Sequence, residues 1–407
     1  AMLLATDPTQ PYRPHRHLLS RLTKALSMGA ICLSSVGMSW HPRADTAPSP
    51  YQSEDYTLEV ETVVQGLEHP WGIAFLPESR ANAINALVTE RSGRVRRIRD
   101  GVLESTPVEG VPAVAVINQG GLLDIALAPD FKTSGELFLS LSEPEDGDAR
   151  TALYRARYDG RSLTDVKRVA GVERASGGGR HFGSRIVFDE QDSVIFSAGE
   201  RGERDRAQDP FDRAGSLLRI TRTGEIPADN PFRDGAQADP MVLSWGHRNP
   251  QGLVRHPVTG ELWEHEHAPR GGDEVNVIRA GANYGWPVIG YGREYTTPEP
   301  VGEGTERDDI ESPRHVWIPS IAPSGMAFYT GERFPAWQGD LFVGSLKYGM
   351  VVRLEVNEYG DILHEERLLE AVLPRIRDVR DGPDGYLYLL TDEENGKLLR
   401  VGPATEE

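Results

Sequence analysis

Several basic side chains of this sequence lie in turn-forming or apolar segments, where they could meet an anionic ligand. Arg248 and Asn249 stand in "GHRNPQG", and Arg248 offers a planar fork that matches a carboxylate. Lys347 stands in "GSLKYG", and Arg375 and Arg377 stand in "PRIRDV", where alternate residues of a strand point the same way. Each side chain alone would more often form a surface ion pair. Together, in a chain with a formal net charge of −18, they indicate a strongly anionic small ligand.

His181 is the candidate general base. It stands in "GGGRHFGSR", where glycines on both sides allow a ligand to approach the backbone closely. Imidazole titrates near neutral pH, so it can accept a proton during catalysis. A lone histidine is nevertheless more often structural than catalytic, and this residue by itself leaves both interpretations open.

A candidate metal site lies in "EHAPRGGDEVN", which combines a proline-containing turn with the acidic pair Asp273 and Glu274. The main-chain carbonyls of Ala268 and Pro269 could face outward in this turn. Oxygen ligands of this kind suit Ca²⁺ rather than zinc or copper.

The polar residues leave a second kind of metal site open, whereas the composition and motifs argue against several other functions. His265 and His267 alternate along one predicted strand and could instead belong to a transition-metal site, although two histidines are a weak signal. The acidic net charge argues against a nucleic-acid partner, which needs a basic surface. The sequence contains neither a G-x-G-x-x-G fingerprint on a strand–helix unit nor a G-x-S-x-G elbow. These absences argue against an NAD or FAD cofactor and against a serine hydrolase.

The elements that must position these residues are predicted to be strands. The chain repeats a short apolar strand, a turn with Pro, Gly or Asp, and a second apolar strand. The six copies begin near positions 72, 121, 184, 252, 325 and 376. Strand pairs at recurring separation with few helical windows favour an all-β, six-bladed β-propeller over an irregular array of sandwiches. The loops of a propeller converge on one end of its axis, so polar residues far apart in sequence can meet there.

The N-terminal segment differs in kind from the rest. Basic residues, including Arg21 and Lys24, precede the apolar run "ALSMGAICLSSVGMSW", which is typical of a secretory signal. This run is shorter than the ~20 residues of a membrane-spanning helix. We expect residues 1–47 to be a signal peptide or, if retained, a membrane anchor, and the protein to be periplasmic. A disordered tail or a buried helix is the alternative. Residues 48–55 are predicted to form a linker and residues 56–405 the propeller.

The only cysteine, Cys32, lies in that apolar run. Removal of the run would therefore exclude thiol catalysis, disulfides and cysteine-bound zinc from the mature protein.

From "GLEHPWGIAF" to "LLTDEENGKLLRV", the chain resembles the soluble pyrroloquinoline-quinone (PQQ) dependent aldose and glucose dehydrogenases. The motifs that carry the resemblance occur in the same order: "QGGLLDIALAPDF", "RHFGSRIVFD", "GHRNPQGL", "APRGGDEVN", "GANYGWPVIGYG", "IAPSGMAFY", "SLKYG" and "RIRDV". The set is far more specific than any one of its members. Its details are closer to the bacterial aldose sugar dehydrogenases than to the longer glucose dehydrogenases.

The resemblance implies oxidation of an aldose sugar to a lactone, with PQQ as hydride acceptor, Ca²⁺ as Lewis acid and an external electron acceptor. His181 would be the general base, and Asp273 would orient it or shape the site. The residues implied to hold the cofactor are Gln119, Arg248, Asn249, Lys347, Arg375 and Arg377. Ca²⁺ would bind the carbonyls of Ala268 and Pro269, and a second, structural ion would bind Glu274 and the Tyr284 carbonyl.

The sequence departs from the family pattern at three positions. Arg180 stands where the glucose dehydrogenases carry an acid, Glu200 where Asp is often found, and Ala268 where Gly is usual. The substrate preference of the family therefore does not carry over. Two other functions are alternatives: a calcium-dependent propeller lactonase, which would not need the group of cations, and a propeller that binds a ligand without catalysis.

Overall fold

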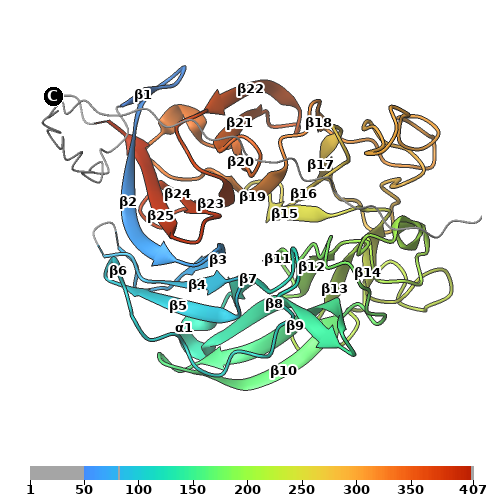
Figure 1. Ribbon diagram of the computed structural model, residues 1–407, viewed down its shortest axis with the longest axis horizontal. Helices are drawn as coiled ribbons and strands as arrows, with labels where there is room; N and C mark the ends of the chain where they lie inside the picture. The colour runs from blue at the N-terminus through green and yellow to red at the C-terminus, as the bar shows by residue number, and fades with distance from the viewer. Residues whose placement is uncertain (1–49, 81–82, 405–407) are drawn as a thin grey trace, which may run out of the picture. The chain divides into compact units, whose positions relative to one another are not determined.

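In the computed structural model, which describes residues 50–80 and 83–404, nearly all regular structure is β-strand. Six antiparallel sheets form the blades of a ring (Figure 1). The predicted six-bladed β-propeller is therefore confirmed. Each sequence repeat begins in the innermost strand of one blade, and the innermost strands of neighbouring blades contact one another around the ring.

Five blades contain four strands each, which follow the chain from the inside of the ring outward. The first blade contains β3 (Pro70–Phe75), β4 (Ala86–Glu90), β5 (Arg94–Arg99) and β6 (Val102–Leu103), and the second contains β7 (Leu122–Leu127), β8 (Glu136–Glu145), β9 (Asp148–Tyr158) and β10 (Leu163–Gly171). The third contains β11 (Ile186–Phe188), β12 (Val194–Ala198), β13 (Ser216–Ile220) and β14 (Val242–Trp245), and the fourth β15 (Pro250–Arg255), β16 (Leu262–Glu266), β17 (Asp273–Val277) and β18 (His315–Trp317). The fifth contains β19 (Pro323–Phe328), β20 (Leu341–Ser345), β21 (Met350–Val356) and β22 (Ile362–Leu368).

The sixth blade closes the ring with strands from both ends of the described chain. Its inner strands are β23 (Ile376–Asp381), β24 (Leu387–Thr391) and β25 (Gly396–Pro403), and its outer strands are β2 (Thr57–Leu67) and β1 (Tyr51–Gln52). β2 pairs antiparallel with β25, with Val60 opposite Val401. The closing pairing hydrogen-bonds an edge that would otherwise be open.

Part of the expected linker is folded. Tyr51–Gln52 pairs with β2, and the carboxylate of Asp55 accepts hydrogen bonds from Trp337 Nε1 at 2.9 Å and from Arg353 at 2.8 Å. These contacts hold residues 51–55 against the fifth blade, so the propeller begins before the expected start at residue 56. Asp55 has this role because Arg353 is almost fully buried and a buried cation needs an anionic partner.

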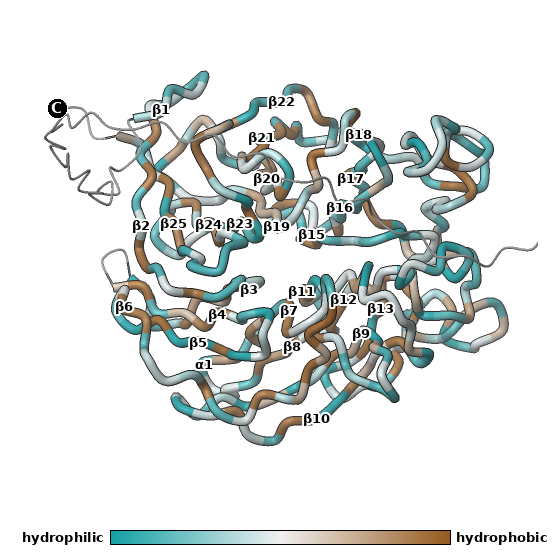
Figure 2. The backbone as a smooth tube through the Cα atoms, viewed as in Figure 1, coloured by the Kyte–Doolittle hydropathy of each residue, from teal (hydrophilic) through white to brown (hydrophobic). Residues whose placement is uncertain are grey.

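Among the described residues, helical structure is confined to three short segments, α1 (Phe131–Ser134), η1 (Arg204–Gln208) and η2 (Pro335–Trp337). Hydrophobic residues recur along the strands, and many loops are hydrophilic (Figure 2). The buried clusters lie between neighbouring blades. One cluster joins Leu87 of β4 to Leu137 and Leu139 of β8. This packing follows from the period-2 pattern of the strands, which turns one set of side chains toward the next sheet.

Charged side chains cross-link the innermost strands. Arg185, just before β11, pairs with Asp378 of β23 at 2.9 Å and with Asp124 of β7 at 3.5 Å. Glycines in the neighbouring strands make room for these two carboxylates. A Cβ atom on Gly72 would lie 2.6 Å from Asp124 Oδ1, and one on Gly325 would lie 2.0 Å from Asp378 Oδ1. The two glycines therefore permit the close approach of neighbouring blades.

The predicted signal or anchor at residues 1–47 lies outside the described residues and stays a prediction. Within residues 50–80 and 83–404, the structure has no helix that is both long and apolar enough to span a bilayer.

Candidate active site

His181 is held by two side chains from loops of neighbouring blades. It lies between β10 and β11 with φ of 56°, and its side chain is buried. Its main-chain N–H donates to Gln119 Oε1 at 2.8 Å. Its Nδ1 atom lies 2.8 Å from Oε1 of Glu200, which follows β12. The main-chain N–H of Glu200 in turn donates to the carbonyl of Arg248 at 2.9 Å.

The charges around His181 favour its neutral form. Burial lowers the pKa of His181, the hydrogen bond with Glu200 raises it in part, and the positive charges of Arg248 and Arg180 lower it again. The net pKa lies below the ordinary value of 6.5. Burial opposes ionisation of Glu200, but its contacts with His181 and the charge of Arg248 outweigh this and lower its pKa. Because Glu200 is ionised, Nδ1 of His181 carries the hydrogen and Nε2 keeps a free lone pair.

Arg248 and Asn249 lie side by side in the turn before β15. Arg248 Nη1 donates to the carbonyl of His267 at 3.0 Å, and its guanidinium lies 5.2 Å from the ring centre of Trp286. Its Nε atom is buried and has no hydrogen-bond partner. Asn249 Oδ1 accepts the N–H of Gly183 at 3.1 Å, which connects this turn to the His181 loop.

Arg375 and Arg377 meet at one carboxylate. Both guanidinium groups lie 3.1 Å from Oδ2 of Asp392, which follows β24. Arg377 Nη1 also donates to Oε1 of Gln251 at 3.2 Å, and its Nε atom is buried without a partner. Although burial opposes ionisation of Asp392, the charge of Arg377, the hydrogen bond with His69 and the contact with Arg375 lower its pKa.

Lys347 completes the group of cations. Its ammonium is exposed and donates to the carbonyl of Ser320 at 3.1 Å. Arg375 Nη1 donates to the carbonyl of Leu346, the residue before Lys347, at 3.1 Å. The six predicted cofactor residues therefore belong to one continuous network of contacts, which runs through the loops of several blades. Gln251 and Asp392 supply links in it.

A small cavity beside Arg248 brings together the four residues predicted to bind metal. Its lining includes Ala268, Pro269, Glu274 and Tyr284. Its free space is about 20 Å³, which is room for a single water molecule or ion. The Pro269 carbonyl accepts the N–H of Arg293 at 3.0 Å and retains a second lone pair. Burial and the negative charge of Glu266 raise the pKa of Glu274.

Asp273 does not contact the candidate base. Its Oδ2 atom accepts hydrogen bonds from Ser320 Oγ at 2.5 Å and from the N–H groups of Ile321 and Ala322 at 2.9 Å. Its Oδ1 atom accepts the N–H of Ala268 at 2.8 Å. Asp273 thus joins the turn at Ala268 to the loop before β19. It makes no contact with His181 that would orient the base, so of its two predicted roles only shaping the site remains. The acid in contact with His181 is Glu200.

The alternative pair of histidines does not form a shared site either. His267 Nε2 lies 2.5 Å from the carbonyl of Pro323, whereas His265 packs directly over Gly252. Sequence reasoning also missed Gln251 and Asp392. Gln251 carried a usable signal, because it is two residues from Asn249 and alternate residues of a strand share a face. Asp392 had no such signal in the sequence, because it lies among other acidic residues in the loop-like segment "TDEEN".

Comparison with known proteins decides the family. The model of the family described as "Glucose / Sorbosone dehydrogenase" matches residues 67–400. This chain belongs to that family. The aldose sugar dehydrogenase YliI of Escherichia coli is 44% identical to it over 357 residues, which cover 85% of this chain and 93% of that protein.

Solved structures of aldose sugar dehydrogenases share the fold. The soluble aldose sugar dehydrogenase of Escherichia coli in the apo form matches with a TM-score of 0.81 at 42% identity, over 86% of this chain and 100% of that one. The PQQ-bound aldose sugar dehydrogenase of Streptomyces coelicolor matches with a TM-score of 0.70 at 26% identity, over 87% and 100%.

Proposed function

We propose that this glucose/sorbosone dehydrogenase oxidises aldose sugars at the anomeric carbon to lactones, with PQQ, Ca²⁺ and an external electron acceptor. One observation carries the proposal. The buried, neutral His181 belongs to the same network of contacts that includes Arg248, Arg375 and Arg377. A lactonase would need the metal but no such group of cations. The PQQ-bound state of the Streptomyces coelicolor relative supports the choice of cofactor.

The residues present fit PQQ, which carries three carboxylates. Arg248 and Arg377 each keep a buried Nε atom without a hydrogen-bond partner, and Lys347 has an exposed ammonium. An anion with several carboxylates would supply acceptors for these donors, and paired contacts of this kind are the stronger class of hydrogen bond. Gln119 and Asn249 would add neutral contacts from the same network.

The chemistry divides between cofactor and protein. When bound, PQQ supplies a quinone that accepts a hydride. Nε2 of His181 takes the proton of the anomeric hydroxyl, because Nδ1 is committed to Glu200. Arg248 and Lys347 provide positive charge where negative charge develops on the acceptor oxygens.

Ca²⁺ fits the cavity that adjoins Arg248. The carbonyl oxygens of Ala268 and Pro269 are hard oxygen ligands, which suit Ca²⁺. The carboxylate of Glu274 and the Tyr284 carbonyl would serve the second, structural ion predicted from the sequence. The Ca²⁺ held by Ala268 and Pro269 would act as a Lewis acid toward the cofactor.

Reconstitution tests the proposal. Purified apoprotein is incubated with PQQ, with Ca²⁺, with both or with neither, and dye reduction is followed with a panel of aldoses. We expect activity only when both are added, with lactone as the product. Lactone hydrolysis without PQQ would instead identify a hydrolase, and neither reaction together with absence of PQQ binding would identify a binding propeller.

A further inference from the structure

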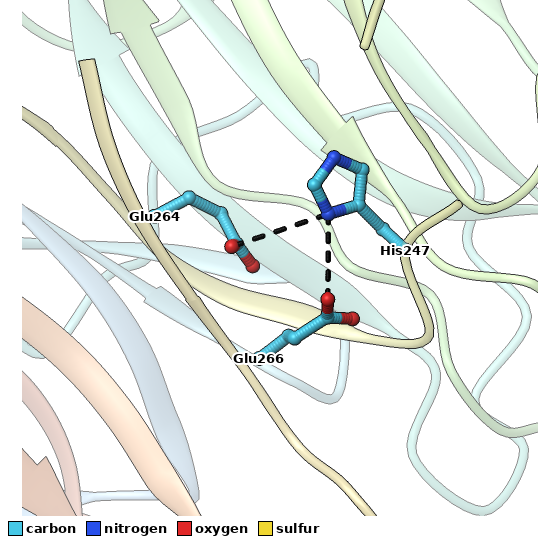
Figure 3. Close-up of side chains that lie close together, drawn as sticks. All are labelled: His247, Glu264 and Glu266. Carbon is cyan, nitrogen blue, oxygen red and sulfur yellow. Dashed lines mark ion pairs between the residues drawn. The ribbon is translucent and has the colours of Figure 1, made fainter. Parts of the chain in front are cut away.

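A second group of ligand-type side chains lies beneath the turn that carries Arg248 and Asn249. Glu264 and Glu266 alternate in β16, so both point to the same side of the strand. His247, in the turn before β15, points its Nδ1 atom toward both carboxylates (Figure 3). All three side chains are buried, and His247 and Glu264 have no exposed surface.

The spacing of the three groups is that of ligands around one ion. His247 Nδ1 lies 3.4 Å from Glu266 Oε1 and 4.0 Å from Glu264 Oε2. The three ligand atoms all lie within 4.8 Å of one another. Bonds of about 2.1 Å in a tetrahedral site place neighbouring ligand atoms roughly 3.4 Å apart. An inward movement of Glu264 would bring its oxygen to this spacing from His247 Nδ1.

Each candidate ligand is held from behind by another group. His247 Nε2 lies 2.9 Å from Ser244 Oγ, and Asn276 Nδ2 donates to Glu264 Oε2 at 3.0 Å. Glu266 Oε2 accepts the main-chain N–H groups of Arg248 and Asn249. Outer contacts of this kind orient the ligands of a metal ion.

Two buried atoms of this group lack hydrogen-bond partners. His247 Nδ1 and Glu264 Oε1 are buried and make no hydrogen bond. Within residues 50–80 and 83–404, neither Glu264 nor Glu266 forms an ion pair with a lysine or an arginine. Two buried carboxylates without a cation are costly. A divalent ion would balance both charges and would also use the free lone pair of the imidazole.

We propose that His247, Glu264 and Glu266 bind a divalent first-row transition-metal ion, for which Zn²⁺ is the suitable probe. A nitrogen ligand beside two carboxylates suits such an ion better than Ca²⁺, which prefers oxygen ligands alone. The donors differ from Ala268, Pro269, Glu274 and Tyr284, and the inference does not depend on the proposed reaction. The ion would tie β16 to the turn that carries Arg248 and Asn249, so its role is structural.

Metal binding by the intact chain tests this inference. Protein freed of metal with a chelator is titrated with Zn²⁺ in the presence of excess Ca²⁺, and bound zinc is counted by elemental analysis. The variant Glu264→Gln keeps the shape of the side chain but removes its charge. We expect it to lose one Zn²⁺ per chain, or to bind that ion at least about tenfold more weakly. It should also lose the rise in melting temperature that Zn²⁺ gives the wild-type protein.

Two controls isolate the site. Glu299→Gln removes an exposed carboxylate elsewhere and should bind zinc as the wild type does. Both variants retain every other histidine of the chain, so only the difference in zinc binding between the variants counts. Equal zinc binding by Glu264→Gln and Glu299→Gln would overturn the proposal. It would indicate that Glu264 and Glu266 share a proton instead of a metal ion.

A direct measurement serves if Glu264→Gln fails to fold. Crystals of the wild-type protein grown with Zn²⁺ are examined by anomalous diffraction at the zinc edge. We expect a peak between His247, Glu264 and Glu266. Anomalous peaks only at other positions, or none at all, would contradict the assignment.

Discussion

Nδ1 of His181 lies 2.8 Å from Oε1 of Glu200, and both side chains are buried on loops of the third blade. This contact decides which nitrogen of the imidazole is available. It also opposes the loss of basicity that burial and the nearby arginines impose on His181. Glu200 is therefore a positioning residue for the candidate base.

The first prediction concerns Glu200→Gln. Without the carboxylate, an influence that raises the pKa of His181 is lost, so this pKa falls further below 6.5. The base acts only when neutral, so kcat/KM rises as pH passes upward through this pKa. The acid limb of the profile should therefore move to lower pH in the variant. At neutral pH the rate should fall by part of the roughly 10²–10⁴-fold that general base catalysis supplies.

The profile of kcat/KM against pH checks this prediction in the reconstituted enzyme. A fall in rate with no movement of the limb would assign Glu200 to folding alone. Movement of the limb to higher pH would contradict the electrostatic account.

The second prediction concerns Lys347→Ala. Hydrogen bonds to charged groups contribute about 1.5–3 kcal/mol, so the affinity for PQQ should fall roughly ten- to a hundredfold. Lys347 is exposed, so the melting temperature of the apoprotein should not change. Fluorescence titration with PQQ measures the affinity, and Lys132→Ala, an exposed lysine in α1, is the matched control. Equal PQQ affinities of the two variants would remove Lys347 from the site.

The third prediction concerns Asp273→Asn. The buried carboxylate of Asp273 accepts four hydrogen bonds, and an amide nitrogen in its place would face donors. Leaving a buried group unsatisfied costs about 1–3 kcal/mol, so the free energy of unfolding should fall by at least that amount. Denaturant unfolding measures it, with exposed Asp309→Asn as control. Because Asp273 does not contact His181, a shifted pH limb in the folded variant would contradict its structural role.

The fourth prediction concerns Ca²⁺. At a concentration 100 times its dissociation constant, a ligand stabilises the folded state by about 2.7 kcal/mol. Removal of Ca²⁺ with EGTA should therefore lower the melting temperature and weaken PQQ binding, and added Ca²⁺ should restore both. Glu274→Gln should reduce the response to EGTA, whereas Glu299→Gln should keep it. Calorimetry that shows no effect of EGTA on the wild type would exclude Ca²⁺ from the folded protein.

Much of the fold could be predicted because its signals are local. Each blade begins with an apolar strand, a turn and a second apolar strand, and these features occur within a short stretch of chain. Ring closure carries no local signal, since Val60 meets Val401 from the opposite end of the described chain. The contacts of Asp55 could not be predicted for the same reason, because its partners Trp337 and Arg353 belong to the fifth blade, far away in the sequence.

The candidate site could be predicted where residues stand in distinctive segments, such as Arg248 in "GHRNPQG". It could not be predicted where a residue acts through a distant partner. Asp392 joins Arg375 to Arg377 only because the sixth blade folds β24 back beside β23. In the segment "LWEHEH", His265 lies on one face of β16, whereas alternation places Glu264 and Glu266 together on the other face.

Reduction of bound PQQ by an aldose in a single turnover, compared between wild type and His181→Asn, tests the central claim most directly. Asparagine tolerates the positive φ of residue 181, so the loop should keep its shape. At equal PQQ occupancy we expect the rate to fall by at least about 10²-fold, which is the low end of what a general base contributes. An unchanged rate would show that His181 is not the base.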